Sequence, residues 1–177
     1  MKKIRLATIW LDGCSGCHMS LLDIDQRLID LADKVEVVFS PLVDTKEFPK
    51  NVDITLVEGA VSTNEDEEKI RKIRQSTRIL AAFGDCAVTA NIPSMRNPIG
   101  AQKMMEAVYL QSNAIQPQIP TVVVPRLNER AFPLHTYVKV DLFIPGCPPS
   151  ADTIYYVLTE LVEGRLPDLT QLSRFGA

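Results

Sequence analysis

Short runs of apolar and β-branched residues alternate along this chain with longer stretches that have helical periodicity. The runs predict five strands, each closed by Gly, Pro or Asp-Gly, at residues 3–11, 35–41, 52–59, 77–84 and 140–146. The fourth run, TRILAAFG, is almost wholly apolar, which is typical of a strand buried on both faces of a parallel sheet.

Helical periodicity places four helices between and after these strands, at residues 18–33, 62–75, 99–111 and 150–164. Ser62, Thr63 and Asn64 can all cap the second helix, and Ser150 can cap the last. Acidic residues at the start of 62–75 and basic residues toward its end complement the helix dipole. We interpret these charges as a solvated helix face rather than a surface for a partner.

The alternation of strands and helices with short connections predicts an α/β fold with a doubly wound, mostly parallel sheet, in one domain over residues 1–177. The segment 112–140 is an exception, because it carries four prolines around one short apolar run. A loop of this length is uncommon unless it is functional or covers a partner. Residues 165–177 are expected to form a C-terminal tail.

Composition narrows the class of protein. The chain has 177 residues, of which 46% are hydrophobic and 23% charged, as expected of one globular domain. A net charge of −3 and scattered basic residues argue against a nucleic-acid surface. No segment has the length of a membrane span or of a signal-peptide apolar region, so we expect a soluble, cytoplasmic protein. In that compartment, cysteines are more often metal ligands or redox groups than structural disulfides.

Each of the four cysteines follows a predicted strand: Cys14 and Cys17 the first, Cys86 the fourth and Cys147 the last. The carboxyl ends of parallel strands share one edge of the sheet, and ligands bind in the crevice beyond it. The four thiols are therefore predicted to meet there. Glycines beside three of the cysteines would let the backbone approach a bulky ligand.

Several ligands are compatible with this pattern. A thioredoxin-type disulfide would use Cys14 and Cys17 and leave the other two cysteines idle. A four-cysteine zinc site is possible in principle, although structural zinc sites usually come from two nearby CxxC pairs. A 4Fe–4S cluster suits four widely spread thiolates and is favoured here. A flavin or nucleotide is disfavoured, because the turn after the first strand places two thiols where phosphate oxygens would sit.

Two further side chains lie near the same edge. Glu58 ends an apolar strand, so it is either a desolvated carboxyl group able to transfer protons or a solvent-facing strand terminus. His18 follows Cys17 directly and would be redundant as a cluster ligand, so we expect a helix-start or interface residue.

Other candidates have ordinary structural interpretations. His135 is expected to be a loop residue, and Asp85 a turn or cap residue. Trp10 and Met19 flank the first cysteine turn and are expected in the core, although a cluster edge covered by a partner would also need apolar residues.

Taken in order, the segments IWLDGCSGCHMSLL, LVEGAV, GDCA and VDLFIPGCPPS resemble the small, electron-transferring subunit of nickel–iron hydrogenases. The closest likeness is to the short form in cytoplasmic, NAD-coupled bidirectional enzymes. The resemblance covers nearly the whole chain. It implies a flavodoxin-like fold that carries one proximal 4Fe–4S cluster on Cys14, Cys17, Cys86 and Cys147.

The resemblance also implies partners. They are a large subunit with the nickel–iron centre and diaphorase subunits that hold FMN, NAD and further iron–sulfur clusters. Glu58 would lie near the interface with the large subunit. Longer small subunits carry a C-terminal extension with ligands for two more clusters and a twin-arginine leader, so a chain without them is expected to be cytoplasmic with a single cluster. Many relatives have an acidic residue where this chain has His18-Met19. The homologous subunit of respiratory complex I has adjacent cysteines in its first motif, so CxxC favours a hydrogenase over a quinone reductase.

Overall fold

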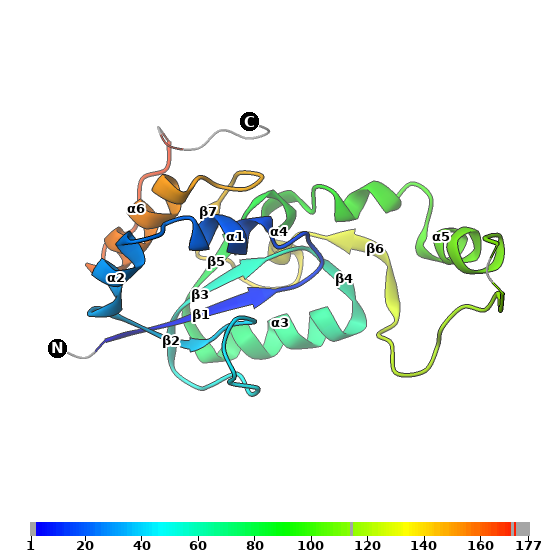
Figure 1. Cartoon of the computed structure of the whole chain (residues 1–177), viewed down its shortest axis with the longest axis horizontal. Helices are drawn as coiled ribbons and strands as arrows, with labels where there is room; N and C mark the ends of the chain where they lie inside the picture. The colour runs from blue at the N-terminus through cyan, green and yellow to red at the C-terminus, as the bar shows by residue number, and fades with distance from the viewer. Residues whose placement is uncertain (1–2, 114, 171, 173–177) are drawn as a thin grey trace.

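Five parallel strands form the central sheet of the computed structural model, which describes residues 3–113, 115–170 and 172. Their spatial order is β2-β1-β3-β5-β7 (Figure 1). The strands are β1 (Ile4–Trp10), β2 (Val35–Phe39), β3 (Val52–Glu58), β5 (Thr77–Phe83) and β7 (Leu142–Ile144). All five predicted strands are confirmed, the last as a shorter strand. This is a doubly wound order, in which the connections change direction between β1 and β3.

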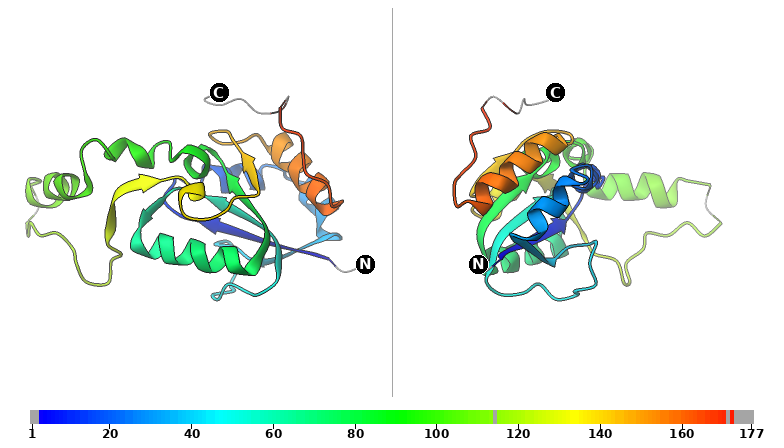
Figure 2. Two further views of the ribbon diagram at one scale, coloured as in Figure 1. Left: turned by 180° about the vertical axis from the view of Figure 1, so that it is seen from behind. Right: turned by 60° about the vertical axis from the view of Figure 1, so that its left-hand side comes forward.

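Both faces of the sheet are apolar, because alternate residues of the central strands point to opposite sides. On one face, Leu56 and Phe83 pack against α1 (Gly16–Leu22), α2 (Arg27–Ala32) and α6 (Ala151–Val162). On the other face, Val57 and Leu80 pack against α3 (Asn64–Ser76) and α4 (Asp85–Thr89). Figure 2 shows these helices on the two sides of the sheet. The predicted α/β fold is therefore confirmed.

Two of the predicted helices have the expected caps. Thr63 and Asp66 form a capping box at the start of α3, and Ser150 accepts a hydrogen bond from the Thr153 backbone N–H at the start of α6. Ile70 and Ile73 are the buried residues of α3, and most of its charged side chains are exposed. The second helix is thus the solvated helix that the sequence predicts.

The helix predicted over 18–33 is wrong as a single element. It is divided into α1 and α2 by a turn in which Asp25 has a φ of 58°. Asp tolerates this left-handed conformation better than most residues. The apolar spacing continues across the turn because Leu21, Ile24 and Leu31 all face the same core.

The region after β5 holds more structure than the sequence indicates. The helix predicted over 99–111 is observed as α5 (Ala101–Met105), which continues into a π-helical segment, η2 (Glu106–Leu110). The predicted loop 112–140 contains β6 (Leu127–Phe132) and the short 3-10 helix η3 (Leu134–Thr136). β6 pairs antiparallel with β4 (Val61–Thr63), and η1 (Pro93–Arg96) follows α4. The strand β6 was not predicted because its sequence, LNERAF, is mostly polar and has only one buried residue.

An extended segment projects from the body of the protein (Figure 1). We call residues 107–126 the arm; all its described residues except Ile119 are exposed. Arg96 and Asn97 hold its base. The Arg96 guanidinium donates to the carbonyl oxygens of Asn128 and Ser62, and the Asn97 amide exchanges two 2.8 Å hydrogen bonds with the Ala131 backbone.

The ends of the chain add little to the fold. The described part of the predicted tail, residues 165–170 and 172, forms no helix or strand, and its remaining residues lie outside the described part. Leu169 packs against the core beneath α6. Within the residues that the structure describes, no helix is long and apolar enough to cross a membrane.

Candidate metal centre

The first cysteine pair lies on the turn from β1 into α1. After β1 and β3, Asp12 and Ala60 exchange two backbone hydrogen bonds, so this turn lies directly beside the end of β3. The close approach requires glycine at position 59, where a Cβ would lie 2.7 Å from the Leu11 carbonyl carbon. Cys14 is exposed, and its sulfur accepts a hydrogen bond from the Gly16 backbone N–H at 3.4 Å. Cys17, in the first turn of α1, is buried.

The third cysteine, Cys86, is the second residue of α4 and directly follows Gly84-Asp85. Gly84 has a φ of 84°, and a Cβ built there would lie 2.1 Å from the sulfur of Cys17. The turns that carry Cys17 and Cys86 are therefore in van der Waals contact, and only glycine fits between them.

The fourth cysteine, Cys147, lies in the PGCPPS turn after β7 and is exposed. Its peptide bond to Pro148 is cis. The turn is connected to both of the others. Asp85 bonds to the backbone of Gly146, and the Ser20 hydroxyl of α1 donates to the Pro149 carbonyl oxygen at 2.6 Å.

The four sulfurs affect each other electrostatically. Burial is the main cause that raises the pKa of Cys17, followed by the charges of Glu58 and the other three cysteines. Burial likewise raises the pKa of Cys86, partly opposed by a hydrogen bond from the backbone of Ile92, and Cys147 and Cys14 raise it further. Thiolates gathered in one place repel each other, and a bound cationic metal centre would relieve that repulsion. The three turns that carry the four cysteines are thus in contact with one another at one edge of the sheet. That the four thiols form one ligand set stays a prediction.

The arrangement distinguishes between the possible ligands. All four cysteines are free of disulfides. Among the described residues, no group of three or more His, Cys, Asp or Glu side chains is placed to hold a metal ion. Zinc requires thiolates about 2.3 Å from one atom, whereas a 4Fe–4S cluster holds its thiolates farther apart and accepts N–H donors at its sulfurs. The residues present suit a cluster in their donor chemistry, since they are four thiols with backbone N–H donors directed at the sulfurs of Cys14 and Cys86.

Glu58 is buried beneath the first cysteine turn, only 1% exposed, so the interpretation as a solvent-facing strand terminus is wrong. Its carboxylate accepts hydrogen bonds from the backbone N–H groups of Cys17 at 3.3 Å and His18 at 3.0 Å. It also pairs with Nδ1 of the His18 ring. His18 is the helix-start residue that the sequence predicts, but it faces inward and is 4% exposed.

A buried chain of hydroxyl groups continues from His18. Nε2 of His18 lies 3.0 Å from the Thr8 hydroxyl, which donates to the Ser40 hydroxyl at 2.9 Å. Glu58, His18, Thr8 and Ser40 therefore form one continuous buried hydrogen-bonded chain. Thr8 and Ser40 were not identified from the sequence, because single hydroxyl residues on predicted strands carry no signal.

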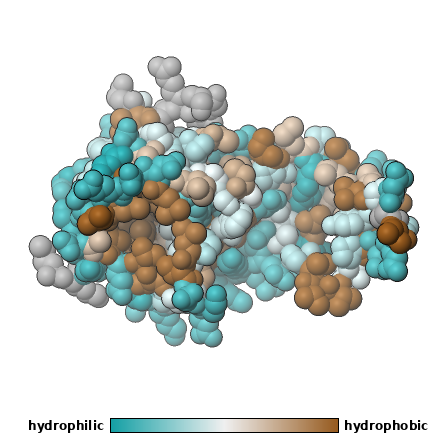
Figure 3. Space-filling view, viewed as in Figure 1, coloured by the Kyte–Doolittle hydropathy of each residue, from teal (hydrophilic) through white to brown (hydrophobic). Residues whose placement is uncertain are grey.

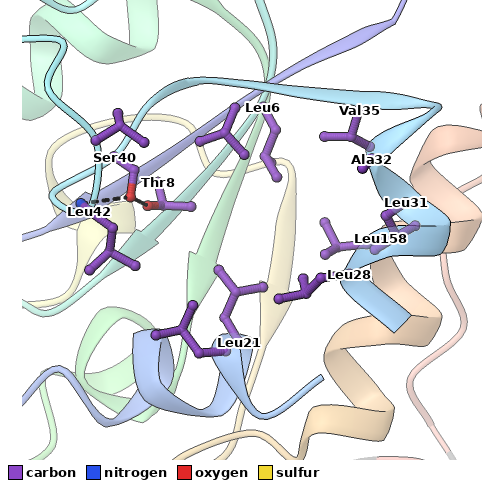
Figure 4. Close-up of a pocket in the computed structure, with 13 residues that line it drawn as sticks. Leu6, Thr8, Leu21, Leu28, Leu31, Ala32, Val35, Ser40, Leu42 and Leu158 are labelled. Carbon is purple, nitrogen blue, oxygen red and sulfur yellow. Dashed lines mark hydrogen bonds between the residues drawn. The ribbon is translucent and has the colours of Figure 1, made fainter. Parts of the chain in front are cut away.

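Thr8 and Ser40 also line an apolar cavity of about 420 Å³ (Figure 4). Its walls include Leu6, Leu21, Leu28 and Val35, and it opens beside β2, where Figure 3 shows a hydrophobic patch. None of the four cysteines lines it. Two hydroxyl groups within apolar walls do not form a phosphate cradle, so this cavity gives no support to a nucleotide or flavin site.

Of the remaining candidates, three are exposed and only Asp85 is buried. Trp10 and Met19 are 44% and 57% exposed, so the prediction that they are core residues is wrong. His135 lies in η3, is exposed, and its ring contacts that of Phe143. Asp85 is the first residue of α4. It is more than a local cap, because its side chain also accepts a hydrogen bond from Gly146 in the Cys147 turn.

Comparison with known proteins gives consistent matches. Residues 14–161 match the family described as NADH ubiquinone oxidoreductase, 20 Kd subunit. The NAD-reducing hydrogenase HoxS subunit delta of Cupriavidus necator is 42% identical, over 94% of this chain and 82% of its own length. A subunit of the F420-non-reducing hydrogenase vhu of Methanocaldococcus jannaschii is 36% identical, over 94% of this chain and 58% of its own length. The chain thus spans little more than half of the second relative.

A solved structure agrees over nearly the whole length. A chain from the crystal structure of an NAD+-reducing [NiFe]-hydrogenase in the H2-reduced state superposes with a TM-score of 0.94 at 40% identity, over 98% of this chain and 99% of that one. A chain of the Dm. baculatum [NiFeSe]-hydrogenase superposes with a TM-score of 0.64 at 20% identity and shares the fold. These matches confirm the resemblance to hydrogenase subunits that the sequence motifs indicate.

Proposed function

Since this chain belongs to the family of the NADH ubiquinone oxidoreductase 20 Kd subunit, we propose that it is the electron-transfer subunit of a cytoplasmic, NAD-coupled nickel–iron hydrogenase. It relays electrons between the nickel–iron site of a large subunit and a diaphorase module with FMN and NAD. The observation that carries the proposal is the contact between the three turns that bear the four cysteines, at one edge of the sheet.

Cys14, Cys17, Cys86 and Cys147 would hold one 4Fe–4S cluster. Such a cluster, when bound, takes up and passes on single electrons. The contribution of the chain itself is to position the four cysteine sulfurs and the hydrogen-bond donors around them. Gly84 leaves space for the sulfur of Cys17, and backbone N–H groups of Gly16 and Ile92 are directed at the sulfurs of Cys14 and Cys86. Hydrogen bonds of this kind raise the reduction potential of a cluster.

Glu58 has two roles in this proposal. It fixes the first turn of α1 through the backbone N–H groups of Cys17 and His18, which directs the Cys17 sulfur toward the site. Its Oε2 also pairs with Nδ1 of His18, and the pair would lie near the interface with the large subunit. Glu58 is therefore a candidate for proton transfer.

Exposed apolar side chains around the cysteine edge support a protein partner there. Trp10 and Met19 flank Cys14 and Cys17, and Ile92 and Met95 follow Cys86 in the chain. The arm adds Val108, Leu110, Ile115, Val122 and Val123, all at least 45% exposed. Apolar exposure on this scale marks an interaction site. We propose that the large subunit covers the cysteine edge and that the arm extends this contact, in keeping with the prediction that 112–140 covers a partner.

The experiment is to purify the chain in its native complex without oxygen and to supply H2. Under the proposal, H2 reduces a cluster whose electron paramagnetic resonance (EPR) signal depends on Cys86, and NAD+ is reduced in turn. The chain purified alone should not turn over H2. Turnover by the isolated chain would contradict the assignment.

The family description favours one second candidate, an iron–sulfur subunit of a quinone-reductase-like assembly related to respiratory complex I. The two candidates share the cluster and differ in the electron donor. Reduction of the cluster by NADH and its reoxidation by a quinone, with no response to H2 in the intact complex, would favour the second candidate.

A further inference from the structure

The turn that carries Cys147 is held by two buried side chains that are not themselves cluster ligands. Asp85 directly precedes Cys86, and Ser20 lies three residues after Cys17. Asp85 is 5% exposed and Ser20 is 6% exposed. Both bond to the Cys147 turn. Asp85 connects it to the turn that carries Cys86, and Ser20 connects it to the turn that carries Cys17.

Asp85 bonds to Gly146 in both directions. Its backbone N–H donates to the Gly146 carbonyl oxygen at 2.9 Å, and its carboxylate Oδ1 accepts from the Gly146 backbone N–H at 2.7 Å. A further backbone bond, from Gly84 N–H to the Ile144 carbonyl oxygen at 2.8 Å, lies beside this pair. The turns before Cys86 and before Cys147 are thereby fixed to each other at the residue adjacent to each ligand.

Ser20 holds the other side of the same turn. Its hydroxyl donates to the Pro149 carbonyl oxygen at 2.6 Å, between residues 129 positions apart in sequence. None of the three prolines of the PGCPPS turn has a backbone N–H to donate, so the turn depends on side chains and on Gly146 for its connections. A ligand must be held within a fraction of an ångström for a cluster to be retained and its potential to be set.

We propose that Asp85 and Ser20 are positioning residues that set where the Cys147 sulfur meets the cluster. This inference rests on the proposed function, since it assumes that the four cysteines hold a 4Fe–4S cluster. Asp85 has a second effect, because a carboxylate close to the cluster favours its oxidised form and keeps its potential low.

The test compares Asp85→Asn, Asp85→Ala and Ser20→Ala in the full chain, purified anaerobically in its complex. Asparagine retains an oxygen that accepts from Gly146 N–H, so Asp85→Asn should keep the iron and sulfide content and raise the midpoint potential. Asp85→Ala and Ser20→Ala leave a buried bond unmade. They should release iron to an external chelator about tenfold faster and alter the EPR spectrum of the reduced cluster.

Two matched controls lie away from the cysteines. Asp53→Asn changes a carboxylate that accepts the Arg5 backbone N–H at 2.9 Å at the opposite end of the sheet. Thr159→Ala removes a hydroxyl that donates to the Tyr155 carbonyl oxygen within α6. Neither should change the potential, the spectrum or the rate of iron release.

The possible outcomes distinguish a failure of this inference from a failure of the proposed function. A wild-type protein without iron and sulfide would overturn the proposed function. A wild-type protein that holds the cluster, together with all three variants matching the controls in potential, spectrum and iron release, would overturn the positioning roles alone. If one alanine variant does not fold, the other still decides, because iron release at the rate of the controls would contradict the positioning role. An unchanged potential in Asp85→Asn would contradict the charge effect of Asp85.

Discussion

The carboxylate of Glu58, at the end of β3, contacts His18 twice: it accepts a hydrogen bond from the backbone N–H and pairs with Nδ1 of the ring. These two residues lie 40 positions apart and are both almost fully buried. The same carboxylate accepts the Cys17 backbone N–H. The start of α1 is therefore anchored to the strand at the switch point of the sheet, and the orientation of Cys17 depends on it.

Replacing Glu58 with alanine should destabilise the protein strongly. Two buried backbone N–H groups and the His18 ring would lose their hydrogen-bond partner, and each such loss costs about 1–3 kcal/mol. Glu58→Gln retains one acceptor oxygen and should cost less. Denaturant unfolding without oxygen measures the difference, with Glu68→Ala on the exposed face of α3 as the control. Equal free energies of unfolding for Glu58→Ala and Glu68→Ala would contradict the anchoring role.

Gly84→Ala should prevent the cysteine turns from packing. The new methyl group would lie 2.1 Å from the Cys17 sulfur, at a backbone φ of 84°. Gly164 is the matched control, because its φ is 77° and an added Cβ would have no atom within 4 Å. Gly164→Ala should cost about 1 kcal/mol from backbone strain alone. Gly84→Ala should cost more and should also reduce the bound iron. Similar iron content and unfolding midpoints in the two variants would show that the close contact with Cys17 is absent.

Cys86→Ser tests whether the cysteines act as one ligand set. With one thiolate missing, the protein should lose most of its iron and sulfide or hold a cluster with a different EPR spectrum. A thioredoxin-type pair at Cys14 and Cys17 would not respond, since Cys86 takes no part in it. Alanine in place of the exposed Ser112 in the arm serves as a control that leaves the thiols untouched. Unchanged iron, sulfide and spectrum in Cys86→Ser would exclude it as a ligand.

Asp141 should make the stability of the fold depend on pH below neutrality. Burial works to raise its pKa, but the Leu80 backbone N–H and the Arg74 guanidinium outweigh burial and lower it. A carboxyl group with a lowered folded pKa stabilises the protein above its unfolded pKa of about 3.9. That stabilisation is lost as the pH falls through the folded value.

Asp141→Asn should therefore cost about 1–2 kcal/mol at pH 7 and progressively less below about pH 4. Unfolding measured at a series of pH values gives this difference. Asp168→Asn is the control, because the Thr170 backbone lowers the pKa of Asp168 at a fully exposed position. A wild-type advantage over Asp141→Asn that stays constant down to about pH 2 would refute the role of the ionised pair.

The sheet and the cysteine edge could be predicted from the sequence because their signals are local. Apolar runs such as 77–84 specify buried strands, and each cysteine follows such a run directly. Parallel pairing then places the strand ends together without any knowledge of the loops. The Ser150 cap of α6 was predictable for the same reason, as a side chain that acts within its own turn.

What could not be predicted depends on contacts between distant segments. β6 forms because β4 lies beside it, and its own pattern is mostly polar. The break at Asp25 is a single backbone angle within continuous apolar spacing. Trp10 and Met19 were expected in the core because apolar residues usually are, yet both are on the surface beside the cysteines. Ser20 carries no sequence signal, since its partner lies in a turn 129 residues away.

The most direct test of the account is the metal and sulfide content of the complex purified without oxygen. The account predicts iron and acid-labile sulfide in near-equal amounts bound to this chain, with no zinc and with loss of both in Cys147→Ser. Zinc in place of iron, or flavin fluorescence from this chain without iron, would contradict it.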